Sequence, residues 1–329
     1  EKLISRIEYL FYFIFINLDI LKKIKTNSTS STDEKKLSQL MTDAMMSENN
    51  NSLLLADEEE ARRFCRTFLI PYHRPRILQC SARNKYAEGK LSKGLLILER
   101  MVVKFKDDPH SNSDNHNTAL EDDFIREIKK MQVLAAAGLY TDRKKNNMRV
   151  QENWMVVYVT AYPLDEEDAS DAFVAKVIEM RNNQRKMLAN ADMNNTNTNH
   201  TPRMINIHGK ILSCLHSSPC KNRFLKLDVD TKEQTLIQQL YHSLTGANII
   251  IAVETRGGYH VILEKGPFCR QLYELERHVN KGVPAENHWL TIESDKGPML
   301  AIPGTNQGGF TVKLATEDWK AGIQGSISD

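Results

Sequence analysis

The chain has 329 residues, and its 44 lysines and arginines against 42 aspartates and glutamates give a formal net charge of only +2. This length suffices for one large domain or two smaller ones with a sizeable core. The near balance of charge excludes a globally basic nucleic-acid binder, so any basic surface must be local. Five irregularly spaced cysteines favour a reducing, intracellular compartment over a disulfide framework, without distinguishing nucleus, mitochondrion and cytoplasm.

Residues 1–55 combine an apolar segment with a polar stretch that predicts disorder. Tyr9 to Ile16 is strongly apolar, but it is far shorter than the about 20 residues that cross a bilayer, so we expect no membrane span. This segment fits a helix that packs on a partner, or sequence that does not belong to the native protein. Thr26 to Ser52 is rich in Ser, Thr, Asn and Lys and lacks an apolar period.

The globular part is predicted to occupy residues 56–320, beginning with an α/β part at about 56–190. The expected elements, from apolar periodicity and flanking breakers, are a helix at Glu58–Leu69, a strand or strand pair at Leu95–Phe105, a helix at Glu121–Leu139, a strand at Asn153–Tyr162 and a helix that starts in the acidic run 165–168. An Asn- and Thr-rich insert at 189–202 follows, which we expect to be mobile.

The second part, about 203–315, alternates strands and helices. The expected elements are a strand at Phe224–Val229, a helix at Thr231–Leu244, a strand at Asn248–Glu254, a turn at Arg256–Gly258, a strand at Tyr259–Leu263, a helix at Gln271–Asn280 and strands near Leu290 and Met299. We expect the strands 225–230, 249–254, 259–263 and 299–302 to form one sheet. The order of elements predicts an α+β fold.

Two aspartates close the strand at 224–229. Asp228 and Asp230 are two residues apart, and side chains alternate along a strand, so both carboxylates face the same way. Two like charges at the end of an apolar strand repel each other unless a cation or a hydrogen-bonding partner lies between them. Oxygen ligands of this kind suit Mg²⁺ or Mn²⁺, so the pair predicts a metal site, with a solvated strand end as the alternative.

A glycine pair followed by a histidine forms the next candidate. Gly257 and Gly258 allow backbone amides to approach an anion closely, and His260 beside them can donate to a phosphate. Arg256 on the same turn is a second phosphate donor. The alternative for His260 is a half-buried histidine whose hydrogen bonds are satisfied within the core.

Three motifs in this order resemble the archaeo-eukaryotic primase superfamily, which includes the primase-polymerases. They are LDVD (227–230), ETRGGYHVIL (254–263) and MLAIPGTNQGGF (299–310), and the resemblance covers roughly residues 150–315. It implies a primase-like catalytic fold with an N-terminal α/β unit and an RRM-like sheet. In that family the DxD strand holds two catalytic metal ions, the small-x-His motif binds the nucleotide's phosphates, and a later strand supplies a third carboxylate.

Carried over residue by residue, the resemblance assigns roles to more of the chain. Its implied catalytic residues are Asp228, Asp230, Glu293 and Asp295, with Asp228, Asp230 and Glu293 holding Mg²⁺ or Mn²⁺. Its implied nucleotide-binding residues are Arg256, Gly257, Gly258, His260, Lys226, Gln307 and Lys313. Two positions depart from the family: Thr291 stands where the third carboxylate is usual, and Ala301 where an arginine often precedes the Pro-Gly loop.

A second metal is suggested by a group of nitrogen and sulfur donors. His208, Cys214, His216 and Cys220 could supply one tetrahedral Zn²⁺ site, with Cys269 as a substitute for His208. The spacing matches no standard finger or ribbon, and the alternative is that the cysteines belong to the core.

These patterns predict a metal-dependent nucleotidyltransferase of primase-polymerase type, acting in DNA replication or damage tolerance. Its expected partners are nucleoside triphosphates, a single-stranded DNA or RNA template, and a helicase or other replication proteins. The alternative is a catalytically inactive primase-fold module that serves as a nucleic-acid-binding or structural subunit.

Overall fold

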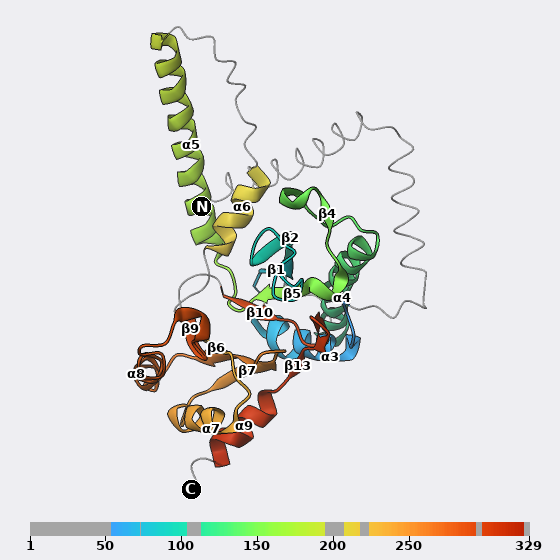
Figure 1. Cartoon of the computed structure of the whole chain (residues 1–329), viewed down its shortest axis with the longest axis vertical. Coiled ribbons are helices and arrows are strands. Elements are labelled where there is room, and N and C mark those ends of the chain that lie inside the picture. Colours follow the sequence, from blue (N-terminus) through green and yellow to red (C-terminus); the bar gives the residue numbers. More distant parts are fainter. Residues whose placement is uncertain are drawn as a thin grey trace. The chain divides into compact units, whose positions relative to one another are not determined.

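The computed structural model describes residues 54–72, 74–103, 113–194, 207–217, 224–293 and 298–325, which combine helices with antiparallel sheets (Figure 1). The predicted α+β class is therefore confirmed. The apolar segment at 9–16 and the polar stretch at 26–52 lie outside the described residues.

A four-stranded antiparallel sheet forms the N-terminal part, in the order β10-β5-β1-β2. Its strands are β1 (Arg76–Arg83), β2 (Leu95–Val103), β5 (Met155–Thr160) and β10 (Met299–Ala301). The predicted strands at 95–105 and 153–162 are confirmed. The central strand β1 was not predicted, because Arg76, Gln79 and Ser81 interrupt its apolar pattern, yet all three are buried.

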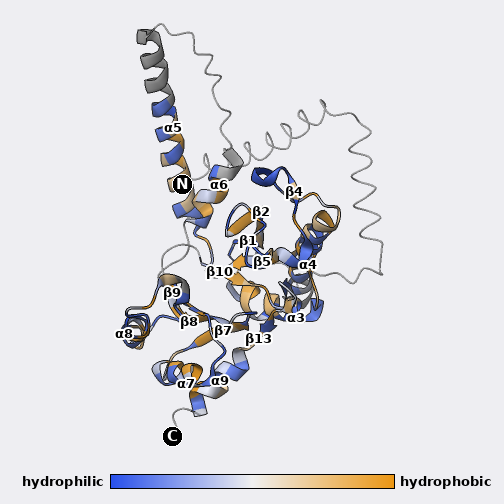
Figure 2. Cartoon of the chain, viewed as in Figure 1, coloured by the Kyte–Doolittle hydropathy of each residue, from blue (hydrophilic) through white to orange (hydrophobic). Residues whose placement is uncertain are grey.

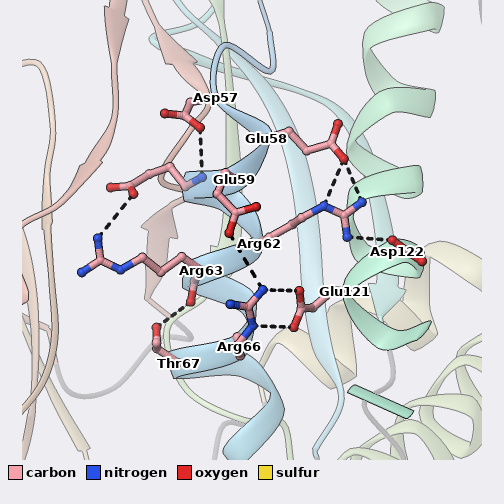
Figure 3. A network of polar contacts seen from close by, with 10 residues as sticks. Asp57, Glu58, Glu59, Arg62, Arg63, Arg66, Thr67, Glu121 and Asp122 are labelled. Atoms are coloured by element: carbon pink, nitrogen blue, oxygen red, sulfur yellow. Dashed lines mark hydrogen bonds and ion pairs between the residues drawn. The ribbon is translucent and has the colours of Figure 1, made fainter. Parts of the chain in front are cut away.

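Two helices pack beside this sheet and are tied together by ion pairs (Figure 3). They are α3 (Glu58–Phe64), which continues as a π-helix at Cys65–Leu69, and α4 (Ser113–Ala136). The guanidinium of Arg66 donates from two nitrogens to the carboxylate of Glu121, at 2.9 Å each. The apolar sides of both helices join the core of the sheet through residues such as Phe64, Phe124 and Ile128.

Two short strands and two helices lie between main strands of the two parts in the sequence. They are the short strands β3 (Thr141–Asp142) and β4 (Met148–Arg149), the helix α5 (Glu166–Asn194) and the helix α6 (Ile207–His216). Because α5 runs to Asn194, the first residues of the predicted mobile insert are helical, and 195–206 lie outside the described residues. No helix in the described ranges is both long and apolar enough to cross a bilayer.

A five-stranded antiparallel sheet, in the order β13-β7-β8-β6-β9, forms the C-terminal part. In chain order its elements are β6 (Phe224–Val229), α7 (Gln234–Ser243), β7 (Ile249–Glu254), β8 (Tyr259–Glu264), α8 (Cys269–Val279), β9 (Leu290–Glu293), β13 (Lys313–Leu314) and α9 (Thr316–Gly325). The expectation that 299–302 joins this sheet is wrong. Those residues form β10, which pairs with β5 in the other sheet.

The two faces of the five-stranded sheet bury different cores. Leu225, Leu227 and Val229 belong to one cluster with apolar residues of α7, α8 and α9. Phe224 on the same strand belongs to the cluster of the four-stranded sheet, as does Ile262 on β8. Strands β5, β7 and β10 are accordingly largely orange in Figure 2. Side chains alternate along a strand, so Lys226 and Asp228 share the face of Phe224 and point toward the four-stranded sheet.

The turn between β7 and β8 lies directly against the end of β6. A Cβ added at Gly258 would come within 1.8 Å of the Val229 carbonyl oxygen and 2.7 Å of the Thr231 nitrogen. The turn is closed by a hydrogen bond from the Thr255 N–H to the Gly258 carbonyl at 2.8 Å. Glycine is required here because two backbone segments are in contact, and this contact positions the turn beside Asp230.

We expect Gly258→Ala to lower the free energy of unfolding by about 1–3 kcal/mol, because the added methyl group must displace backbone atoms. Gly94→Ala is the matched control, since a Cβ at Gly94 would meet nothing within 4 Å. Urea unfolding of the two variants measures the difference. Equal stability of both variants would contradict the close backbone contact.

Candidate active site

A cleft of about 530 Å³ lies between the two sheets. The four-stranded sheet lines it with Arg83 of β1, Arg100 of β2 and Tyr158 of β5, and the five-stranded sheet with Lys226, Asp228, His260 and Glu293. This volume is within the roughly 300–1,000 Å³ range of small-molecule sites. The lining is rich in charged side chains of both signs, which suits a polar, charged ligand.

Asp228 and His260 are cross-strand neighbours at the floor of the cleft. They are paired in the register of β6 and β8, and the His260 Nε2 lies 3.3 Å from Asp228 Oδ1. The other ring nitrogen, Nδ1, accepts a hydrogen bond from the Ala301 N–H of β10 at 3.3 Å. Because Nδ1 is an acceptor, a neutral imidazole carries its proton on Nε2 and directs it at Asp228.

The expectation that His260 faces a phosphate is therefore corrected. The imidazole lies on the same face as Asp228, and its two nitrogens are used by Ala301 and Asp228. Burial lowers the pKa of His260 to about 3, and the nearby Lys226 acts in the same direction. The residue is neutral near pH 7 and orients Asp228 instead of carrying a positive charge.

The two aspartates have different electrostatic surroundings. Burial alone would raise the pKa of Asp228, but Lys226 and His260, with Arg83 and Lys85, hold it below its ordinary value. Burial and the charge of Asp228 raise the pKa of Asp230 above its ordinary value, despite Lys85 and Arg83. Asp228 is therefore compensated by cations of the protein, whereas the charge of Asp230 is disfavoured.

Lys226 of β6, two residues before Asp228, forms an ion pair with Glu293 of β9. The Lys226 Nζ lies 2.8 Å from Glu293 Oε2 and 3.8 Å from Asp228 Oδ2, and only 3% of its side chain is exposed. In the register of β6 and β9, Glu293 is opposite Lys226, and Thr291 is opposite Asp228. The implied third carboxylate is thus engaged with a lysine, and Lys226 is not directed at a nucleotide.

Two basic residues near the aspartates were missed in the sequence. Arg83 ends β1, and its guanidinium donates to the Tyr158 hydroxyl at 3.2 Å. Lys85 follows in the β1–β2 turn, and both charges act on Asp228 and Asp230. The sequence feature that could have identified them is the run Arg83-Asn84-Lys85 before a glycine-containing turn. This run points to a basic strand end only if β1 is first recognised as a strand.

The glycine turn and the Pro-Gly loop are joined by Arg256. The Arg256 N–H donates to Gln307 Oε1 at 2.9 Å, and its guanidinium donates to the Gly308 carbonyl at 2.7 Å and lies over the Tyr86 ring. Gln307 starts the hairpin of β11 (Asn306–Gln307) and β12 (Phe310–Thr311). Gln307 therefore holds the turn, and Arg256 remains a candidate for contacting an anion.

Lys313, a further predicted residue, does not reach the site. Lys313 is in register with Glu254, so it lies on the opposite face of the sheet from Val253 and His260, which are the next pair. Asp295 lies outside the described residues.

The predicted zinc ligands are not assembled in the described part of the chain. Cys214 and His216 lie two residues apart on α6, and side chains at that spacing do not face each other. Cys214 is buried, whereas His216 lines the cleft. Cys220 and the side chain of His208 lie outside the described residues, and Cys269 accepts a hydrogen bond from the Gly266 N–H.

The candidate ligands for a hard divalent ion are the carboxylates of Asp228 and Asp230. Among the residues that the structure describes, no three or more His, Cys, Asp or Glu side chains lie close enough to hold a metal ion. Burial, and then the charge of Asp228, raise the pKa of Asp230, so a cation beside Asp230 would stabilise its charged form. Two carboxylates fit Mg²⁺ or Mn²⁺ provided that water and substrate oxygens complete the coordination.

Comparison with protein-family models, with curated proteins and with solved structures finds no match for this chain.

His260 should make the stability of the metal-free protein depend on pH. Its folded-state pKa is about 3 against an ordinary value of 6.5, so between these values the unfolded chain binds a proton that the folded protein does not. The unfolding free energy should therefore be highest above this window and fall as the pH decreases through it, by at most about 1.4 kcal/mol per pH unit.

The measurement is urea unfolding in EDTA between about pH 7 and pH 5, for the wild type and His260→Asn. The asparagine oxygen can still accept from the Ala301 N–H, but the side chain does not titrate. Burial and Arg100 also lower the pKa of His216, but His216 is common to both proteins and cancels. The wild type should show the steeper loss of stability, and parallel pH profiles would count against a buried neutral His260.

Proposed function

We propose that this chain is a metal-dependent nucleotidyltransferase of the primase-polymerase type, which adds nucleotides on a nucleic-acid template. The observation that carries the proposal is the pair Asp228 and His260 in one cleft, with Asp230 two residues after Asp228, beside a glycine turn whose backbone contacts the end of the aspartate strand. The order of the three motifs supports the same reaction class.

The fold supports this proposal at the level of topology. The elements β6-α7-β7-β8-α8-β9 follow the order βαββαβ, and their strands lie in the order β7-β8-β6-β9. This is the arrangement of ferredoxin-like and RRM-like sheets. The site lies where such a sheet faces the N-terminal four-stranded sheet, so we propose a primase-like catalytic fold in which both sheets contribute to one cleft.

In the proposed reaction a 3′-hydroxyl oxygen forms a bond to the α-phosphorus of a nucleoside triphosphate. The bond from that phosphorus to the bridging oxygen breaks, pyrophosphate leaves, and the hydroxyl proton passes to water. A divalent ion held by Asp228 and Asp230 would stabilise the charge on the entering and leaving oxygens.

The chain's own residues would position and neutralise the reactants. His260 orients Asp228 through Nε2, and the hydrogen bond from Ala301 fixes the ring. Lys85 and Arg256 replace His260 as the proposed partners of the triphosphate. Both carry positive charge on turns: the charge of Lys85 acts on both aspartates, and Arg256 precedes Gly257, which lies beside Asp230.

One specific observation favours an inactive module that binds nucleic acid. Thr291 occupies the register position opposite Asp228, and Glu293 is paired with Lys226. A site with this arrangement has fewer carboxylates than the family pattern implies, and the arginines of the cleft could still bind a single strand without catalysis. Binding of an oligonucleotide in EDTA, together with no incorporation in Mn²⁺ or Mg²⁺, would support this second function.

Asp230→Asn should separate catalysis from stability. We expect it to reduce nucleotide incorporation on a primed single-stranded template at least about 100-fold, because a metal ligand is lost. The same variant should stabilise the metal-free protein, since the raised pKa of Asp230 means that its charge is disfavoured in the folded state. The measurements are primer extension with Mn²⁺ or Mg²⁺ and urea unfolding in EDTA.

Glu274→Gln, at an exposed ion pair on α8, is the matched control for loss of one negative charge. It should keep wild-type incorporation. Full activity of Asp230→Asn would show that Asp230 is not a ligand of the catalytic metal.

Lys85→Gln should raise the KM for nucleoside triphosphate about tenfold with a smaller change in kcat, because the residue is assigned to binding phosphate charge. Lys90→Gln is the control, since Lys90 is close in sequence and pairs with the exposed Glu88. Steady-state kinetics at saturating template measure both constants. Identical KM values for the two variants would show that Lys85 does not bind the triphosphate.

A further inference from the structure

Lys226 is a buried ammonium group in contact with two carboxylates of the cleft. Its Nζ lies 2.8 Å from Glu293 Oε2 and 3.8 Å from Asp228 Oδ2, with 3% of the side chain exposed. An ammonium group is buried only where anions compensate the lost hydration. These two carboxylates do so: burial alone would lower the pKa of Lys226, but Asp228 and Glu293 together hold it above its ordinary value.

The positive charge of Lys226 lies where a metal ion shared by Asp228 and Glu293 would have to bind. A divalent cation at that position would be repelled by the ammonium and would have to displace it from a buried ion pair. The backbone register fixes this arrangement, because Glu293 of β9 is directly opposite Lys226 of β6.

Asp230 follows Asp228 by two residues at the end of β6, and side chains alternate along a strand, so both carboxylates leave the strand on the same side. The proposed function assigns the divalent ion to these two carboxylates. A further ion between Asp228 and Glu293 has no room, because the Lys226 Nζ already lies within 2.8 Å of Glu293 Oε2 and 3.8 Å of Asp228 Oδ2.

We infer that the site binds a single divalent ion, between Asp228 and Asp230, and that the ammonium group of Lys226 occupies the place of a second ion. Lys226 is thus a positioning residue that holds Glu293 away from the metal and supplies a fixed positive charge beside Asp228. This inference rests on the proposed metal-dependent function and specifies how many ions that function uses.

The stoichiometry of Mn²⁺ binding tests the inference without relying on activity. The full chain, freed of metal with EDTA and dialysed, is titrated with Mn²⁺, and free Mn²⁺ is followed by electron paramagnetic resonance. We expect one Mn²⁺ per wild-type chain. Lys226→Met keeps the length of the side chain and removes its charge, so Asp228 and Glu293 become available and the expected stoichiometry rises to two.

Glu293→Gln provides a second arm in case Lys226→Met does not fold. Because Glu293 is assigned to Lys226 and not to the metal, this variant should bind one Mn²⁺ with an affinity within about twofold of the wild type. In the double variant Lys226→Met/Glu293→Gln, the stoichiometry should return from two to one.

The outcomes separate the inference from the proposed function. Two Mn²⁺ per wild-type chain, or a loss of affinity of about tenfold or more in Glu293→Gln, would overturn the inference and leave a metal-dependent enzyme in place. A stoichiometry of one in a folded Lys226→Met variant would also overturn it. Absence of Mn²⁺ binding to the wild type would remove both the inference and the proposed metal-dependent function.

Discussion

The negative charge of Asp228, held between two sheets, is the constraint on which the rest of the site depends. A carboxylate in such a place is tolerated only with cations or hydrogen-bond donors around it. The donors come from several elements: Lys226 from the same strand, His260 from the neighbouring strand, and Arg83 with Lys85 from the other sheet. The hydrogen bond from the Ala301 N–H to His260 links the two sheets at the same point.

This compensation makes the cleft electrostatically mixed instead of uniformly basic. Lys226 pairs with Glu293, Arg83 bonds to Tyr158, and Asp230 remains the acid whose charge is disfavoured. A nearly neutral chain can therefore offer a locally charged site, because opposite charges are arranged around one cleft and not spread over the surface.

The backbone contacts around the glycines hold the turns beside Asp230, which form the rim of the proposed site. Gly258 allows the β7–β8 turn to contact the end of β6, and Gly308, at φ +61, leaves space for the Arg256 guanidinium and the Tyr86 ring. Three separate turns are joined by these contacts and by the Arg256 hydrogen bonds. A charged ligand at this rim would therefore meet groups whose positions are already fixed.

The sequence by itself determined the local elements of the C-terminal part. The strand at 224–229 has the predicted bounds, because an apolar run closed by aspartates is a local signal. That His260 lies on the face of Asp228 was decided by the pairing of β6 with β8. Sequence periodicity missed β1, whose buried Arg76 and Gln79 hide the apolar pattern that identifies strands.

Only the tertiary structure decided which charges meet. Strand register and the packing of the two sheets decide three features of the site. Strand β10 pairs with β5, Lys226 lies between Asp228 and Glu293, and the charge of Arg83 acts on the aspartates. Sequence periodicity carries no information on these pairings, since they join residues far apart in the chain. The role of His260 changed for the same reason: its sequence neighbours are glycines, but its contacts are Ala301 and Asp228.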